Sequence, residues 1–337
     1  MESSDTLQAS SNTSMLPLSM SPDASSPVAT RKRYTLRGRC LVLLVCLAVF
    51  VCLILLVRTT LIPCWTTANE MAFINKVVAG GGPGPVPLQH AHSHNDYERP
   101  LPLTGALALG FCSVEADVHL SGGKLYIGHV VAGSDTIEDI YLTPLAARIA
   151  ASSIGTVYNR STRLGLCETV TLLVDLKTTT TEAWDVLEAL LRRPDFQALT
   201  GCGGQAATLA TAAATGVKWP PLMVIVSGIS QGAAPAFAAH MVSKGTSRCS
   251  WLDGRDPATA DANVQSVARM YSRAWGGDLE NSATLLRSYV AAAHALGARV
   301  RFWNSPDTAA QWKRLLAAGV DIISTDQLSA LYAFLNG

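Results

Sequence analysis

The feature that most restricts the fold of this sequence is a short β-forming segment that recurs eight times between residue 86 and the C-terminus. The eight segments are residues 86–92, 112–120, 170–177, 221–228, 248–254, 267–271, 299–304 and 321–325. Segments with the composition of helices separate several of them, namely residues 103–110, 181–193, 282–297 and 307–319. Strands that alternate with helices indicate parallel strands joined by helical crossovers. Eight such units within about 250 residues predict an α/β fold of the (β/α)8 TIM-barrel type over residues 86–337, rather than an open doubly wound sheet.

The chain before residue 86 has a different composition. Residues 1–39 begin with a stretch rich in Ser, Thr and Pro and end in RKRYTLRGR, which predicts a disordered cytoplasmic tail with a basic flank. Residues 40–57 contain no charged residue, and a helix of that length spans about 27 Å, close to the thickness of a bilayer's hydrocarbon core. We therefore predict a transmembrane signal anchor at 40–57, with a cleaved signal peptide as the alternative. Residues 58–85, which end in AGGGPGP, are predicted to form a linker.

The charge distribution sets the expected location and excludes one class of partner. Basic residues beside a membrane segment favour the cytoplasmic side, so we predict a single-pass type II membrane protein with a lumenal or extracellular barrel. The formal net charge is +1, and no long basic run follows the N-terminal one, so we expect no nucleic-acid partner.

Four of the eight cysteines belong to the predicted barrel: Cys112, Cys167, Cys202 and Cys249. Their spacing shows neither a disulfide framework nor the close pairs of a metal motif. A lumenal or extracellular location would permit disulfides, but the spacing does not indicate which cysteines would pair.

Polar residues at strand ends are the candidates for chemistry, because TIM barrels carry their active sites at the carboxyl ends of the strands. Glu115 and Asp117 lie two residues apart and share one face of a predicted strand. A divalent cation with oxygen ligands, Mg²⁺ or Ca²⁺, would remove their repulsion, while a barrel arginine paired with one of them is the alternative. Asp175 and Lys177 have the same spacing, and form either an ion pair or a third metal ligand beside a cation for a phosphate.

The histidines have two candidate uses. His92 and His94 stand in QHAHSHNDY at the end of the first predicted strand, where a histidine pair can bind zinc as in amidohydrolase barrels. Such a site also needs histidines near the ends of the fifth and sixth predicted strands, and none stands there. The other use is acid–base catalysis, in which one of these histidines faces His129 across a phosphate. His129 closes KLYIGHV, and the alternative for it is a solvent-facing loop histidine.

The order His, ExD, His, DxK resembles the glycerophosphodiester phosphodiesterase-like superfamily of PLC-like phosphodiesterases, which includes the sphingomyelinase D-type phospholipases. Within it, HAHSHNDYERPLPLTGALALGFCSVEADVHLSGGKLYIGH is similar to the altered inheritance of mitochondria protein 6 family. LLVDLK, WLDGR, RVRFW and GVDIISTDQL extend the similarity to about residues 86–335. The phosphodiesterase triplet HRG is HND in this chain, which removes the arginine from that position.

The resemblance implies a role for each candidate residue. Three would hold one divalent metal, namely Glu115, Asp117 and Asp175. The catalytic group would comprise His94 or His92, His129, and Lys177 as the cation that stabilises phosphate charge. Arg255 and Trp303 are further candidates for substrate contact.

The predicted function is metal-dependent hydrolysis, or cyclising cleavage, of a glycerophosphodiester or a lipid phosphodiester. Two alternatives stay open at this point. One is a membrane-tethered, catalytically inactive barrel that serves as a binding module, and the other is a zinc amidohydrolase that uses His92 and His94.

Overall fold

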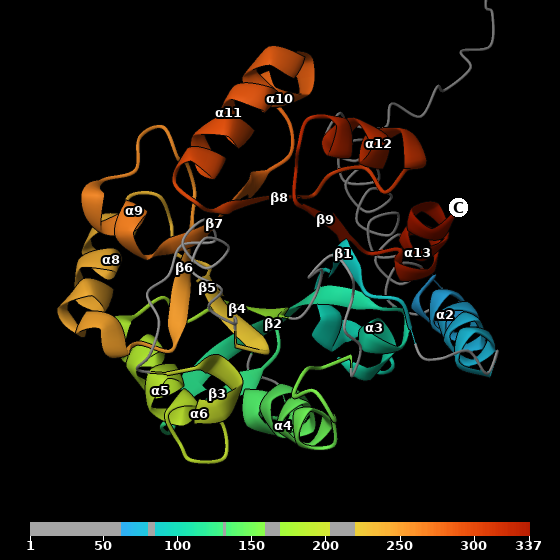
Figure 1. Cartoon of the computed structure of the whole chain (residues 1–337), viewed down its shortest axis with the longest axis horizontal. Coiled ribbons are helices and arrows are strands. Elements are labelled where there is room, and N and C mark those ends of the chain that lie inside the picture. Colours follow the sequence, from blue (N-terminus) through green and yellow to red (C-terminus); the bar gives the residue numbers. More distant parts are fainter. Residues whose placement is uncertain (1–61, 80–84, 131–132, 159–168, 203–219) are drawn as a thin grey trace, which may run out of the picture. The chain divides into compact units, whose positions relative to one another are not determined.

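A computed structural model describes residues 62–79, 85–130, 133–158, 169–202 and 220–337. The barrel strands are β1 (Leu88–Ser93), β2 (Phe111–Ser121), β4 (Val170–Leu176), β5 (Leu222–Ser227), β6 (Ser250–Gly254), β7 (Ala268–Ala274), β8 (Arg299–Trp303) and β9 (Ile322–Thr325). Each pairs in parallel with the next, and β9 pairs with β1, so the sheet closes on itself (Figure 1). The eight predicted strands and the TIM-barrel fold are confirmed.

Helices that follow the barrel strands surround the barrel on its outside (Figure 1). They are α3 (Thr104–Ala108), α4 (Thr143–Ala150), α5 (Thr181–Leu191), α8 (Ala234–Ser243), α9 (Ala262–Val267), α11 (Ala283–Ala295), α12 (Ala309–Ala317) and α13 (Leu328–Asn336). Side-chain caps begin several of them: Thr180, Ser282 and Thr308 each accept a hydrogen bond from the backbone N–H three residues on. Their short side chains provide hydrogen-bond acceptors for backbone N–H groups that have no partner within the first helical turn. This explains where these crossover helices start.

A hairpin extends β2 beyond the barrel. Strand β3 (Lys124–Ile127) pairs antiparallel with the end of β2, and the turn between them uses Gly122 and Gly123 with φ of 53° and 75°. Glycine adopts this left-handed backbone without the steric cost of a side chain. The hairpin returns the chain to the end of β2, where the N–H of Gly128 donates to the carbonyl of Asp117 at 3.0 Å.

The barrel interior is apolar at one level. Leu173, Met223, Ile225, Met270 and Ile322 form a buried cluster separate from the larger core between sheet and helices. Since side chains alternate along a strand, the next inward positions toward the carboxyl ends carry different residues, and Asp175 and Ser227 are two of them. The apolar layer therefore forms a floor beneath the polar groups at the carboxyl ends.

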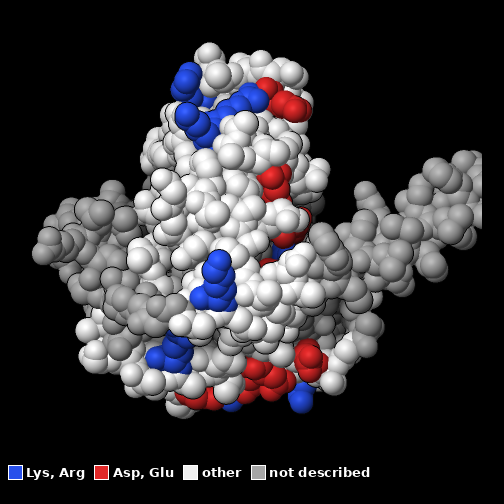
Figure 2. All heavy atoms as spheres, turned by 90° about the vertical axis from the view of Figure 1, so that its right-hand side faces the viewer, with Lys and Arg blue, Asp and Glu red and all other residues white. Residues whose placement is uncertain are grey.

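A helix occupies most of the segment predicted as a linker. Helix α2 (Ile62–Ala79) lies outside the barrel, where Ile74 is 5% exposed and the ring of Phe73 packs edge-on against Tyr332 of α13. The prediction of a linker over 58–85 does not hold for these residues, because α2 buries apolar side chains against the barrel helices. Figure 2 looks onto the side of the molecule that carries α2 and α13, and most of this face has no charged side chain.

The tail and the membrane segment predicted at 1–39 and 40–57 lie outside the described residues. Among the helices that the structure describes, none is both long and apolar enough to cross a membrane.

A disulfide joins Cys202 and Cys249, which are 47 residues apart in the sequence. The spacing of the cysteines had not indicated this pair. Cys202 follows the short helix α6 (Gln197–Thr200) and Cys249 precedes β6, and the fold brings their Cα atoms to 4.5 Å. Spacing in the sequence carries no sign of this approach because a crossover between strands separates the two residues.

Candidate active site

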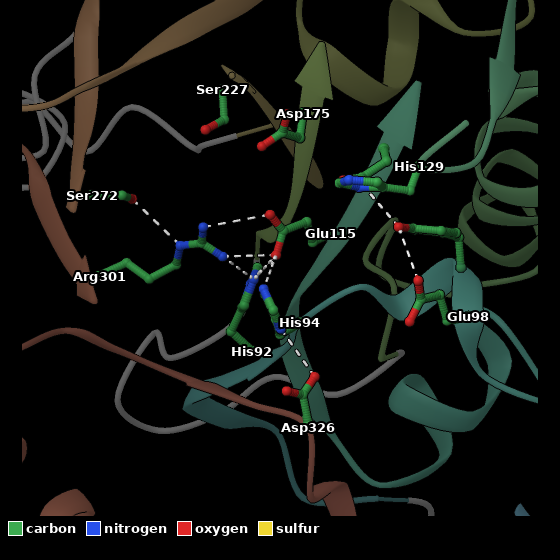
Figure 3. A network of polar contacts seen from close by, with 12 residues as sticks. His92, His94, Glu98, Glu115, His129, Asp175, Ser227, Ser272, Arg301 and Asp326 are labelled. Atoms are coloured by element: carbon green, nitrogen blue, oxygen red, sulfur yellow. Dashed lines mark hydrogen bonds and ion pairs between the residues drawn. The ribbon is translucent and has the colours of Figure 1, made fainter. Parts of the chain in front are cut away.

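A cavity of about 360 Å³ opens at the carboxyl ends of the barrel strands. Its lining residues are His94, Asn95, Glu115, His129, Asp175, Lys177, Ser227, Arg255, Arg301, Trp303 and Asn304. Every predicted site residue except His92 and Asp117 is in this lining, and both of those are buried beside it. The structure thus brings together residues from β1, β2, β4, β8 and the connecting loops (Figure 3).

Three carboxylates meet at this cavity. One oxygen from each of Glu115, Asp117 and Asp175 lies within 4.8 Å of the others. Parallel pairing explains the arrangement, since the register sets Asp117 of β2 beside Asp175 of β4. Burial raises the pKa of Asp175, although Lys177 opposes the effect. These three residues could hold a metal ion that takes oxygen ligands.

Lys177 lies among the carboxylates. Its Nζ is 2.9 Å from Oδ2 of Asp117 and 3.2 Å from Oδ1 of Asp175. Burial alone would lower the pKa of Lys177, but the charge of Asp175 and the hydrogen bond to Asp117 outweigh it and raise that pKa. The ammonium group stays charged and offsets part of the repulsion among the acids.

Arg301 is a site residue that the sequence analysis missed. Its Nη1 lies 2.8 Å from Oε2 of Glu115, and the two side chains are 3% and 4% exposed (Figure 3). Burial would raise the pKa of Glu115, but the guanidinium charge holds it well below its usual range. An available signal was the spacing in RVRFW, where Arg301 precedes Trp303 by two residues and so shares its face of the strand.

His92 is sealed inside the barrel. Its Nδ1 lies 2.7 Å from Oγ of Ser113, and Nη1 of Arg301 lies 2.7 Å from its Nε2. A guanidinium can only donate, so Nε2 accepts and Nδ1–H donates to the serine. Burial and the charge of Arg301 lower the pKa of His92 to about 4. This imidazole is neutral, and both of its nitrogens are occupied.

His94 is partly exposed and faces the cavity. Its Nδ1 lies 2.9 Å from Oδ1 of Asp326, and its Nε2 lies 3.9 Å from Oε2 of Glu115 (Figure 3). Burial would lower the pKa of His94, but the hydrogen bond to Asp326 and the charge of Glu115 outweigh it and raise that pKa. The carboxylate of Asp326 orients the ring, which leaves Nε2 directed at the cavity. The sequence analysis had not paired these two residues.

His129 stands at the rim of the cavity with 69% of its side chain exposed. Its Nδ1 lies 3.0 Å from Oδ2 of Asp117, and the hydroxyl of Tyr97 donates to the same oxygen at 2.8 Å. The hairpin holds it there, because Nε2 of His119 donates to the carbonyl of His129 at 2.8 Å. His129 and His94 therefore reach the carboxylates from different strands.

Arg255 and Trp303 line the wall of the cavity. Arg255 is held by Asp253 at 3.1 Å and by Oγ of Ser227 at 3.3 Å. Asp253 is buried, so this pair fixes the guanidinium at the end of β6. Trp303 ends β8 and is 38% exposed, which leaves part of its ring free for contact.

The fold and site define a TIM barrel with carboxylates, histidines and cations grouped at the carboxyl ends of its strands. Residues 85–217 match the family model of the AIM6-like phosphodiesterase domain, which confirms the resemblance to that family. A search of curated proteins finds no significant match.

Solved structures similar to this chain include a glycerophosphodiester phosphodiesterase from Agrobacterium tumefaciens str. C58, at 14% identity and a TM-score of 0.40, covering 74% of this chain and 100% of that one. Another is a glycerophosphodiester phosphodiesterase from Parabacteroides distasonis ATCC 8503, at 14% identity and a TM-score of 0.41, covering 73% of this chain and 96% of that one.

Proposed function

We propose that this chain is a metal-dependent phosphoric diester hydrolase, or a cyclising phosphodiesterase, acting on a glycerophosphodiester or lipid phosphodiester. The observation that carries the proposal is the grouping of Glu115, Asp117 and Asp175, whose ligand atoms lie within 4.8 Å of one another beside a cavity lined by cations. Lys177 and Arg301 are two of those cations. The negative charge of a phosphodiester would be complementary to these cations, and a metal ion bound by the carboxylates would add further positive charge.

The donor set fits a hard divalent cation, Mg²⁺ or Ca²⁺. All three candidate ligands are carboxylates, and Oδ1 of Asp117 is buried with no hydrogen-bond partner among the described residues. A buried carboxylate oxygen without a donor is costly, and a cation would satisfy it. Once bound, such an ion supplies positive charge to the phosphate oxygens.

Two histidines are suitably held for proton transfer. In the proposed reaction, Nε2 of His94 takes the proton of the attacking hydroxyl, which belongs either to water or to the substrate itself. Asp326 then stabilises the imidazolium through Nδ1, at the 2.9 Å distance of the resting site. His129, anchored on Asp117 through Nδ1, gives a proton to the leaving oxygen from Nε2.

The remaining cations act on the charge of the transition state. Lys177 sits between two of the metal-ligand candidates, and Arg301 is fixed by Glu115 and by Oγ of Ser272 at 3.4 Å. Both are already oriented, so little reorganisation is needed as the phosphate gains charge. Arg301 therefore supplies from β8 the guanidinium that the HND sequence lacks after β1.

The geometry disfavours the zinc amidohydrolase alternative. His92 accepts from Arg301 and donates to Ser113, so its ring has no nitrogen for a metal. The metal-ligand group found among the described residues is made of carboxylates alone. An inactive barrel that binds ligands stays a rival, and activity measurements separate the two. The predicted anchor at 40–57 adds a reason to expect a lipid substrate, since it would hold the barrel at a bilayer.

Phosphorus NMR on the full-length chain tests the proposal. The protein is mixed with glycerophosphodiesters, lysophospholipids and sphingomyelin, in Mg²⁺, in Ca²⁺ or in EDTA. A new phosphomonoester or cyclic-phosphate resonance that requires metal supports it, and the chemical shift identifies water or the substrate's hydroxyl as the nucleophile. No new resonance under any condition overturns it in favour of the binding module.

A further inference from the structure

Arg99 connects the N-terminal helix α2 to the histidine that we assign to proton transfer. It lies after the short turn η2 (Asp96–Glu98), which follows β1, and its side chain is 16% exposed. Nη2 of Arg99 lies 3.1 Å from Oδ1 of Asp326 and donates to the carbonyl of His94 at 3.1 Å, while Nη1 donates to the carbonyl of Asp326 at 2.9 Å. One guanidinium thus fixes both partners of the His94–Asp326 hydrogen bond.

The carboxylate oxygen that binds His94 is the same one that binds Arg99. Oδ1 of Asp326 accepts from Nδ1 of His94 at 2.9 Å and from Arg99 at 3.1 Å. The Asp326 side chain is 57% exposed, so its own burial does little to hold its rotamer. Its orientation toward His94 depends on Arg99, whose Nη2 binds the carboxylate while its Nη1 binds the backbone carbonyl of the same residue.

Helix α2 supplies the next contact. Oε2 of Glu70 lies 4.0 Å from Nη1 of Arg99, and the Glu70 side chain is 13% exposed. Burial raises the pKa of Glu70, with the charge of Arg99 opposing it. Oε1 of Glu70 and Nε of Arg99 are both buried and make no hydrogen bond within the described parts of the chain. Arg99 also pairs with Asp326, and Arg99 is the cation that compensates the charge of Glu70. Ile74 anchors the same helix on the barrel side.

We infer that Arg99 is a positioning residue for His94 and that Glu70 holds Arg99 in place, so that α2 takes part in turnover without touching the substrate. This inference rests on the proposed function. It gives α2 a role in the enzyme itself: displacement of the helix would release Arg99, then Asp326, and leave His94 free to rotate. The chain of contacts runs from Glu70 through Arg99 and Asp326 to His94.

The kinetic test uses the full-length chain and four variants: R99Q, E70Q, the double variant, and K76Q as the control on the exposed face of α2. R99Q should lower kcat about 10- to 100-fold with little change in KM, as loss of a group that orients a catalytic residue does. E70Q should lower kcat by a smaller factor, and the double variant should be no worse than R99Q. Losses that multiply, or E70Q and R99Q values equal to that of K76Q, would overturn the inference.

A second measurement does not depend on turnover. The imidazole Nδ1 proton of His94, assigned through its loss in H94Q, should give a downfield NMR resonance while Asp326 holds it. R99Q should broaden or remove this resonance at a pH where the wild type shows it, E70Q should weaken it, and K76Q should leave it intact. If the resonance responds but no phosphodiester is cleaved by the wild type, the contacts stand and the proposed function fails. If the wild type turns over and the resonance is unchanged in R99Q, the positioning role fails.

Discussion

The guanidinium of Arg301 lies 2.8 Å from the carboxylate of Glu115, and the barrel excludes solvent from both side chains. This one contact provides the site with both an ionised carboxylate and a fixed cation. It keeps Glu115 ionised, as its proposed role as a metal ligand requires, and it holds a cation beside the position proposed for the phosphate. The site is therefore organised by charge pairs that form before any ligand binds.

Replacing Arg301 should destabilise the protein. R301Q leaves Glu115 buried without its partner, and removing one member of a buried ion pair typically costs about 3–5 kcal/mol of unfolding free energy. Urea unfolding in EDTA should show this loss, and Mg²⁺ should recover part of it because a cation can compensate Glu115. The control is R287Q on the exposed face of α11, expected within about 0.5 kcal/mol of wild type. Equal stability of R301Q and R287Q would refute the role of this pair.

Substitutions of His94 and His92 should have different effects on turnover and on the free energy of unfolding. H94Q is expected to lower kcat by about 10²- to 10⁴-fold while the unfolding free energy changes little, because its ring is partly exposed. H92Q should instead lower the unfolding free energy by about 1–3 kcal/mol, since it disturbs buried bonds to Ser113 and Arg301. Both quantities are measured for each variant. Full turnover in H94Q would show that another group removes the proton.

Asp117 should be required for both metal binding and turnover. D117N keeps the size of the side chain and an acceptor for Lys177 and Tyr97, but it removes the charge that a divalent cation needs. Turnover should fall by about 10²- to 10³-fold or more. Calorimetric titration with Mg²⁺ should show weaker binding. The matched control is D195N, which changes an exposed ion pair. Wild-type turnover by D117N would exclude the proposed role of Asp117 as a metal ligand.

Asp96 should make stability depend on pH in an unusual direction. It is fully buried, accepts from the hydroxyl of Tyr141, and burial raises its pKa to about 6, against 3.8 for an unperturbed group. Between these two values the folded state binds more protons than the unfolded state, so the contribution of Asp96 to unfolding free energy falls as pH rises. The full change is about 3 kcal/mol.

Urea unfolding of wild type and D96N at pH 4, 5, 6 and 7 isolates this contribution. The wild type should lose stability relative to D96N as pH rises through this range, and the difference should level off above about pH 6. Parallel stability curves for the two proteins would show that Asp96 titrates normally in the folded state.

The barrel could be predicted because its signals are local. Each β-forming run is a few residues long, helix-forming segments separate several of them, and this alternation leaves few alternatives to parallel strands. The spacing of Glu115 and Asp117 predicted a shared face, and the structure has both side chains directed into the barrel. Helix α2 escaped prediction because its apolar residues show no clear helical periodicity, and its contacts with α3 and α13 arise only in the fold.

By itself, the sequence determined the fold class, the strands and the set of residues available at their carboxyl ends, because strand periodicity and alternation are properties of neighbouring residues. Only the tertiary structure decided which of these residues contact one another. Arg301 meets Glu115 across 186 positions and Asp326 meets His94 across 232, and in each case closure of the barrel brings distant strands together. The same closure buries His92 and leaves His94 at the cavity. Which side chains pair depends on which strand ends become neighbours in the closed barrel, and no local pattern in the sequence indicates that.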